Sequence, residues 1–199
     1  MNILGITIDE RLNFNTHVTN LCRKAGQQLN ALKRLSPFLD FTSRMTVFKS
    51  FILCNFNYCP LIWHYCGCIN ARKLEKIQYR ALKFVYNCDD SYETLLQRAD
   101  LPSINLARIR KIAIEVFKIL NQTSPDVLNG MISFRENRRA IIPRRRTTRF
   151  GLLSFTYDGA KIWNALPNDL RVCENYTLFK KLLLSWTGPS CNCAICRSS

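Results

Sequence analysis

The chain has 199 residues, of which 47% are hydrophobic and 22% charged. These proportions are typical of a folded globular protein and exclude a disordered tail, and the length fits one domain or two small ones. Lysine and arginine number 29 against 14 acids, a formal net charge of +15. Such an excess favours a polyanionic partner, either nucleic acid or an anionic membrane surface. The alternative is a basic protein without a specific partner, and the clustering of the charge argues against it.

No targeting or membrane-spanning segment is visible. The N-terminus carries Asp9 and Glu10 and has no basic residues ahead of an apolar run, so it does not resemble a secretory signal. The most apolar stretch, 51–65, is short and is interrupted by Pro60, so we expect no membrane span and no membrane partner. Ten cysteines without a secretion signal predict reduced thiols or metal ligands rather than disulfides. We therefore expect an intracellular protein, nuclear or cytoplasmic, that is not secreted.

The first part of the chain predicts a set of helices behind one short strand. Segment 3–9 is apolar and β-branched and indicates a strand. A lone strand needs partners, which either come from far downstream or are missing from this chain, and we favour the second. Apolar residues at helical spacing then predict helices over about 16–35, 42–58 and 71–86. The second of these is apolar on nearly every side and should therefore be central and buried. Two further helices are expected at 91–99 and 104–120.

The predicted helix 71–86 carries a row of basic residues on the side opposite its apolar face. Helical periodicity brings these residues together as a continuous ridge, formed by Arg72, Lys73, Lys76, Arg80 and Lys83. The ridge is suited to tracking phosphates. The alternative is a solvated face, where like charges repel and only Glu75 is near enough in sequence to relieve them. The sequence leaves both interpretations open.

The strongest functional feature is a basic segment, 135–149, that holds seven arginines and one acid, Glu136. Pro143 in its middle prevents a regular helix. Arginine offers planar, bidentate donors that suit phosphate, and such contacts make binding strongly salt-dependent and largely independent of sequence. The predicted contacts are Arg138, Arg139, Arg144, Arg145, Arg146 and Arg149. A nuclear localisation signal is the alternative interpretation of the same arginines.

Aromatic and apolar residues follow this segment and predict a small packed unit. Segment 152–157 indicates a short strand or hairpin edge, 159–166 a helical turn that carries Trp163, and 178–186 a last amphipathic helix. The aromatic side chains here are suited to stacking on bases, but their spacing favours packing in a core. They are Phe150, Phe155, Tyr157 and Trp163.

The C-terminal tail contains Cys191, Cys193 and Cys196, close enough in sequence to share one metal ion. A structural zinc site requires four ligands in tetrahedral geometry. The fourth would come from another chain or from Cys173, Cys66, Cys68 or His64. No second pair of closely spaced cysteines follows, so a reduced tail without metal is the alternative. No other cofactor is expected in this chain.

The sequence does not contain the constellation of a self-sufficient enzyme. Only His17 and His64 are available for a Ser–His–acid arrangement, and no glycine-rich phosphate loop occurs. The adjacent pair Asp89-Asp90 lies between two predicted helices, where acids commonly cap a helix or face solvent.

Three passages resemble the reverse transcriptases of non-LTR (LINE-type, jockey- or CR1-like) retrotransposons. LGITID at 4–9, with Leu12-Asn13-Phe14 behind it, resembles the segment just after the polymerase palm. YCPLIW at 58–63 and QYRA at 78–81 resemble the middle of the same region. GAKIWNALP at 159–167 resembles the C-terminal region and is a specific rather than a generic pattern. The passages occur in the right order and cover nearly the whole chain.

The resemblance implies a parent RNA-directed DNA polymerase whose thumb grips the template–primer duplex through its backbone. It implies the end of the palm at 1–12, a helical thumb-like domain at 13–130, an arginine-rich arm at 131–150, a small C-terminal unit at 151–187 and the cysteine tail at 188–199. The paired catalytic aspartates of the family have no match in this chain. Mg²⁺ chemistry is therefore implied for the parent polymerase only, and polymerase activity by this chain alone is not expected.

We thus expect a mainly α fold, a multi-helical thumb-like domain with an N-terminal remnant strand and a small α+β C-terminal unit. The expected function is binding of an RNA–DNA or DNA duplex through its phosphates, with the upstream palm and finger domains as further partners. The alternatives are a helical protein-interaction module held by a zinc-bound cysteine tail, or a non-functional truncated copy. On this interpretation the chain arose from a truncated copy or from a gene model that starts at an internal methionine.

Overall fold

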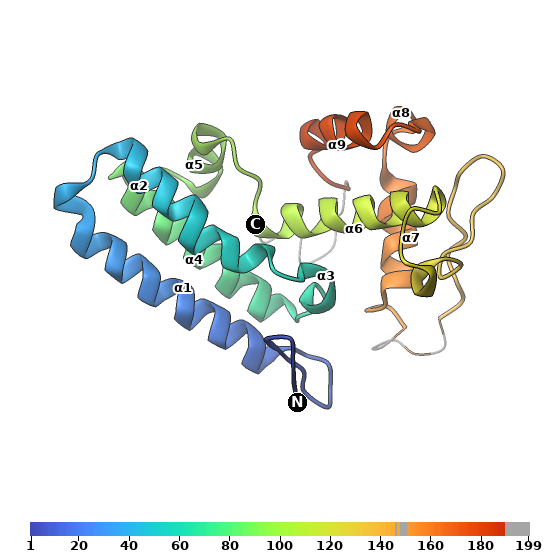
Figure 1. Cartoon of the computed structure of the whole chain (residues 1–199), viewed down its shortest axis with the longest axis horizontal. Coiled ribbons are helices and arrows are strands. Elements are labelled where there is room, and N and C mark those ends of the chain that lie inside the picture. Colours follow the sequence, from blue (N-terminus) through green and yellow to red (C-terminus); the bar gives the residue numbers. More distant parts are fainter. Residues whose placement is uncertain (146, 148–150, 190–199) are drawn as a thin grey trace. The chain divides into compact units, whose positions relative to one another are not determined.

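A computed structural model describes residues 1–145, 147 and 151–189. Within these residues the fold is mainly helical, as expected, and the sheet is limited to two short strands at the N-terminus (Figure 1). The chain divides into two compact units, Met1–Asn105 and Leu106–Ser199, which are described separately below. None of the helices in the described residues has the length and apolar character needed to cross a membrane.

The N-terminal segment pairs with itself. β1 (Asn2–Ile3) and β2 (Ile6–Thr7) are antiparallel, with Ile3 opposite Ile6. The turn between them places Gly5 at φ +81°, a left-handed conformation that glycine adopts without a side-chain clash. The expectation of a strand without a partner is therefore wrong, because the chain reverses within the predicted strand and supplies its own partner.

Asp9 connects this hairpin to the first long helix. Its carboxylate accepts hydrogen bonds from the backbone N–H groups of Arg11 (3.1 Å), Asn13 (3.1 Å) and Phe14 (2.7 Å). Partial burial alone would raise the pKa of Asp9, but these backbone donors outweigh it and hold the pKa below its usual value. Phe14 precedes α1 (Asn15–Leu35) and gives it no side-chain cap, so the fixed loop around Asp9 defines where the helix starts.

The second predicted helix is helical but not regular. α2 (Phe41–Val47) is followed by a π-helical turn, η2 (Phe48–Ile52), and by a 3₁₀ segment, η3 (Leu53–Asn57). The side-chain amide of Asn55 donates to the carbonyl oxygens of Phe51 (2.7 Å) and Ile52 (2.9 Å), acceptors that a regular α-helix would use for its own backbone. The burial expected for every side is also wrong, because Phe51 is 60% exposed.

Three more helices complete the first unit: α3 (Pro60–Trp63), α4 (Cys68–Tyr86) and α5 (Tyr92–Ala99). Ser91 caps α5 by accepting from the backbone N–H of Thr94, as the sequence predicts. α1, α2 and α4 run side by side in Figure 1, and α4 packs against both of the others. The core is formed by buried side chains of α1, η2, α3, α4 and α5, with Val18, Ala25, Leu29, Leu32, Phe48, Ile52, Trp63, Leu74, Ala81, Leu82, Val85 and Leu95 at its centre.

α6 (Ile104–Leu120) has the bounds that the sequence predicts, and most of it belongs to the second unit. This unit also contains a short 3₁₀ turn, η4 (Asp126–Leu128), and the helices α7 (Phe155–Ala165), α8 (Asn168–Val172) and α9 (Tyr176–Ser185). Its core is aromatic. Phe117 stacks on Phe179 with ring centroids 4.3 Å apart, and the Trp163 ring lies 6.0 Å from the Phe179 ring.

The strand expected at 152–157 is wrong. Ser154 accepts from the backbone N–H of Tyr157 and starts α7 at Phe155, so a helix cap overrides the alternating pattern. In the described residues of 151–187 we find helices and turns but no strand. An isolated antiparallel bridge between Phe134 and Ala140 lies upstream instead. The small C-terminal unit is therefore α rather than α+β in the part that the structure describes.

Candidate nucleic-acid interface

α4 presents its five predicted cations on one face, which we call the α4 ridge: Arg72, Lys73, Lys76, Arg80 and Lys83. The first four are exposed and Lys83 is half-buried. The opposite face of α4 is buried, with Leu74, Ala81 and Val85 each 0% exposed. Burial of the apolar face thus fixes the rotation of the helix and directs the basic face outward.

Glu75, the acid that the sequence places within the ridge, points elsewhere. Its carboxylate accepts from the Tyr92 hydroxyl (2.5 Å) and from the backbone N–H groups of Ile104 (3.1 Å) and Asn105 (2.7 Å). It therefore caps the N-terminus of α6, where a negative charge is favourable. In the part of the chain that the structure describes, no carboxylate forms an ion pair with Arg72, Lys73, Lys76 or Arg80. The repulsion among these four cations is therefore not offset by an acidic side chain, and a bound polyanion would offset it.

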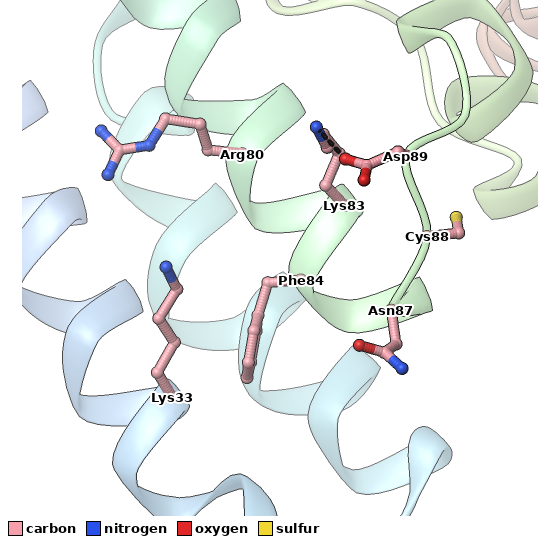
Figure 2. Close-up of a pocket in the computed structure, with 7 residues that line it drawn as sticks. All are labelled: Lys33, Arg80, Lys83, Phe84, Asn87, Cys88 and Asp89. Atoms are coloured by element: carbon pink, nitrogen blue, oxygen red, sulfur yellow. Dashed lines mark ion pairs between the residues drawn. The ribbon is translucent and has the colours of Figure 1, made fainter.

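Within the described residues, Lys83 is the ridge member with an acidic partner, Asp89, as the dashed line in Figure 2 shows. The hydrogen bond to Asp89 raises the pKa of Lys83. Its Nζ also lies 5.4 Å from the centroid of the Tyr79 ring. The neighbouring Asp90 pairs with Arg98 instead. Asp89 and Asp90 thus form ion pairs with two different cations and do not form one common site.

The ridge also borders α1. Burial raises the pKa of the Cys22 thiol on α1, while the positive charge of Lys73 acts in the opposite direction. A basic residue of α4 therefore lies close enough to α1 to influence a side chain on it.

The arginine-rich arm is only partly described, and its arginines differ. Arg139, Arg144 and Arg145 are exposed, and the Arg145 guanidinium lies 5.9 Å from the centre of the Tyr157 ring. Lys161 approaches the same ring at 5.7 Å. Arg146 and Arg149 lie outside the described residues. The exposed members are accessible to a phosphate, and their role stays a prediction.

Arg138 has a different environment from the other arm residues. Its side chain is only 21% exposed. The guanidinium lies 3.4 Å from each of four oxygens, those of the Val172 and Cys173 carbonyls, the Asn121 side chain and the Glu174 carboxylate. The backbone carbonyl of Arg138 accepts from the Trp163 indole at 2.7 Å. This geometry ties a loop to the α8–α9 connection and does not leave the guanidinium free for a phosphate.

The aromatic residues after the arm mostly pack inward. Trp163 is 0% exposed, so it belongs to the core and not to a base-stacking surface. Phe155 and Tyr157 are half-buried, and Phe150 lies outside the described residues. The preference for core packing that the spacing indicates is confirmed for Trp163.

The cysteine tail, with Cys191, Cys193 and Cys196, also lies outside the described residues. Of the candidate fourth ligands, Cys66 and Cys173 are buried, Cys68 is exposed and His64 is half-buried. Within the described ranges, no three histidine, cysteine or acidic side chains come close enough together to hold a metal ion. A zinc site built by the tail stays a prediction.

One basic residue near the ridge escapes sequence reasoning. Lys33 of α1 lines a pocket together with Arg80 and Lys83 of α4, although it is far from both in sequence. Its position in the last turn of a predicted helix gives no indication of which helix it faces. Only the packing of α1 on α4 brings the three cations together.

Comparison of the chain with protein-family models, with curated proteins and with solved structures finds no match in any of the three.

Proposed function

We propose that this chain binds the sugar–phosphate backbone of an RNA–DNA or DNA duplex, as a thumb-like part of a non-LTR retrotransposon reverse transcriptase. The α4 ridge is the observation that carries the proposal: a row of exposed cations on one rigid helix, of which four have no carboxylate partner in the described residues. The resemblance of the sequence to that family supports the same function independently of the structure.

The dimensions of the ridge suit a polyphosphate. From Arg72 to Lys83 the helix rises by about 16 Å, at about 1.5 Å per residue. A duplex carries one negative charge per about 1.7 Å of its axis, so several phosphates fall within that length. Each phosphate that the ridge neutralises releases counterions, and this gain supplies affinity without reading the base sequence.

The proposed role is to hold the duplex. The catalytic aspartates and their Mg²⁺ ions belong to an upstream palm in the proposed parent protein. Arg139, Arg144 and Arg145 of the arm supply further phosphate contacts in the second unit. In the proposed parent the palm and finger domains are the protein partners, and the site of action is nuclear or cytoplasmic.

A salt titration tests the proposal. The full chain is mixed with fluorescently labelled RNA–DNA duplexes of two unrelated sequences, and binding is followed by anisotropy. We expect equal affinities for the two sequences and an affinity that falls steeply, on a log–log plot, between about 50 and 200 mM salt. An affinity that does not change with salt, or a strong preference for one sequence, would refute phosphate-led binding.

A further inference from the structure

An open pocket of about 370 Å³ lies at the C-terminal ends of α1 and α4. Lys33 comes from the last turn of α1, and Arg80, Lys83 and Phe84 come from α4. The connection after α4 contributes Asn87, Cys88 and Asp89 to the lining. In Figure 2, Lys33 and Arg80 lie on one side of the Phe84 ring and the Lys83–Asp89 pair on the other.

The pocket carries more positive than negative charge. It contains the three cations Lys33, Arg80 and Lys83 against the single acid Asp89, a net charge of +2. The Lys33 Nζ lies 5.7 Å from the centre of the Phe84 ring, which gives this cation a contact within the pocket. Lys33 and Lys83 each occupy the last turn of a helix, where the negative end of the helix dipole stabilises a positive charge.

The ion pair between Lys83 and Asp89 is easily exchanged. The Asp89 side chain is 90% exposed, and exposed ion pairs contribute little stability. An anion that enters the pocket therefore replaces Asp89 as the partner of Lys83 at a small cost. The Asn87 side chain also lines the pocket.

We propose that this pocket binds a phosphomonoester, either the terminal phosphate of a nucleic-acid strand or a free nucleotide, with the Phe84 ring against the sugar or base. A phosphomonoester carries about −1.5 to −2 charges near neutral pH, which matches the pocket better than the single charge of an internal phosphodiester. Where the phosphate is that of a nucleic-acid strand, this proposal rests on the proposed function. Where it is that of a free nucleotide, it does not. The ligand has to be held by side chains, because the pocket lies at the C-terminal ends of α1 and α4, where the helix dipole does not favour an anion.

Two pairs of probes test the inference, each differing only in one phosphate. The first pair is adenosine 5′-monophosphate and adenosine, measured by isothermal titration calorimetry. The second is an RNA–DNA duplex with a 5′-phosphate and the same duplex with a 5′-hydroxyl, measured by anisotropy. We expect each phosphorylated probe to bind about tenfold more tightly than its counterpart, as one additional charge-assisted contact implies.

Three variants of the full chain locate the effect. Lys33→Gln should abolish the preference for the phosphorylated probes and leave the affinity for the 5′-hydroxyl duplex nearly unchanged. Asp89→Asn should strengthen the preference, because it removes the competing carboxylate, and a gain in binding cannot result from unfolding. Lys24→Gln, a change at an exposed α1 residue outside the pocket, should leave the preference as in the unmodified chain.

The outcomes separate this inference from the proposed function. If neither phosphorylated probe binds better than its counterpart, the pocket inference is wrong, even if the 5′-hydroxyl duplex binds with the expected salt dependence. If the nucleotide shows the preference but no duplex binds, the pocket is upheld for free nucleotides and the proposed function fails.

Discussion

Replacing Glu75 with alanine is expected to destabilise the first unit more than replacing an exposed acid of the same unit such as Glu10. The carboxylate accepts from one hydroxyl, that of Tyr92, and from two backbone N–H groups at the start of α6. The alanine variant leaves those N–H groups without their cap. It also removes one of the two acceptors on α4 for the hydroxyl of the half-buried Tyr92, the other being the side-chain oxygen of Gln78.

The magnitude follows from these contacts. A hydrogen bond to a charged group contributes about 1.5–3 kcal/mol, and loss of a helix N-cap costs about 0.5–2 kcal/mol. Glu75 is half-buried, so water can replace part of the lost hydrogen bonding, and the loss of stability is smaller than the sum of these contributions. We expect Glu75→Ala to lower the free energy of unfolding by about 2–4 kcal/mol. Glu75→Gln, which keeps an acceptor but loses the charge, should cost about half as much.

Hydrogen–deuterium exchange measured by mass spectrometry is a suitable assay because it reports on each unit separately. Peptides from α4, α5 and the start of α6 should lose protection in Glu75→Ala, and urea midpoints followed by circular dichroism should fall in parallel. Glu10→Ala removes an exposed acid of the same unit and should change stability by less than about 0.5 kcal/mol. A loss below about 1 kcal/mol in Glu75→Ala would refute the capping role.

Three further predictions concern other parts of the chain. Burial, and then the charge of Glu75, raise the pKa of Tyr92 above the value of 10.0 of a free tyrosine. The stability that the neutral Tyr92 hydroxyl contributes should therefore be complete below about pH 10 and be lost as the pH rises further. Urea titrations at pH 8 to 11 should show a smaller loss of stability in Tyr92→Phe. In α7, a Cβ at Gly159 would lie 3.2 Å from Val116 Cγ2 and 3.3 Å from Ile132 Cδ1. Both neighbours are buried, so this crowding should outweigh the gain of about 1 kcal/mol in helix propensity, and Gly159→Ala should lower the melting temperature of the second unit. An unchanged or raised melting temperature would contradict this packing. Joint replacement of Arg144, Arg145 and Arg146 by alanine should weaken binding to all duplex sequences alike, and a sequence-selective loss in anisotropy would argue against backbone contacts.

Local signals in the sequence predict much of the helical fold. The bounds of α6 and the length of α1 follow from helical periodicity, and the start of α5 follows from its capping residue, Ser91. Segment 152–157 shows how two local signals compete, because its alternating pattern indicates a strand while Ser154 provides a helix cap. The cap prevails, since it fixes a turn that the following residues then extend.

Contacts between residues far apart in sequence are what the sequence does not predict. In the sequence Glu75 looks like a partner for the ridge cations. In the structure it accepts from the backbone N–H groups of Ile104 and Asn105, which follow it by 29 and 30 positions. Arg138 looks like one more phosphate ligand of the arm, but its guanidinium contacts Val172, Cys173 and Glu174. Lys33 joins the cations of α4 only because α1 packs on that helix. Periodicity places a side chain on a face, and tertiary packing decides what that face meets.

The salt dependence of a ridge variant tests directly whether the α4 ridge binds phosphates. The variant carries Arg72→Gln, Lys76→Gln and Arg80→Gln, and the control carries Arg11→Gln, Lys24→Gln and Lys49→Gln, which remove the same charge from exposed positions elsewhere in the first unit.

If the three ridge residues contact phosphates, the slope of log affinity against log salt becomes shallower by about 2.7 in the ridge variant. Its affinity then falls about 40-fold less than that of the unmodified chain between about 50 and 200 mM salt. The control should keep nearly the original slope. Equal slopes for the ridge variant and the control would contradict the account, because the binding would then follow net charge and not the α4 ridge.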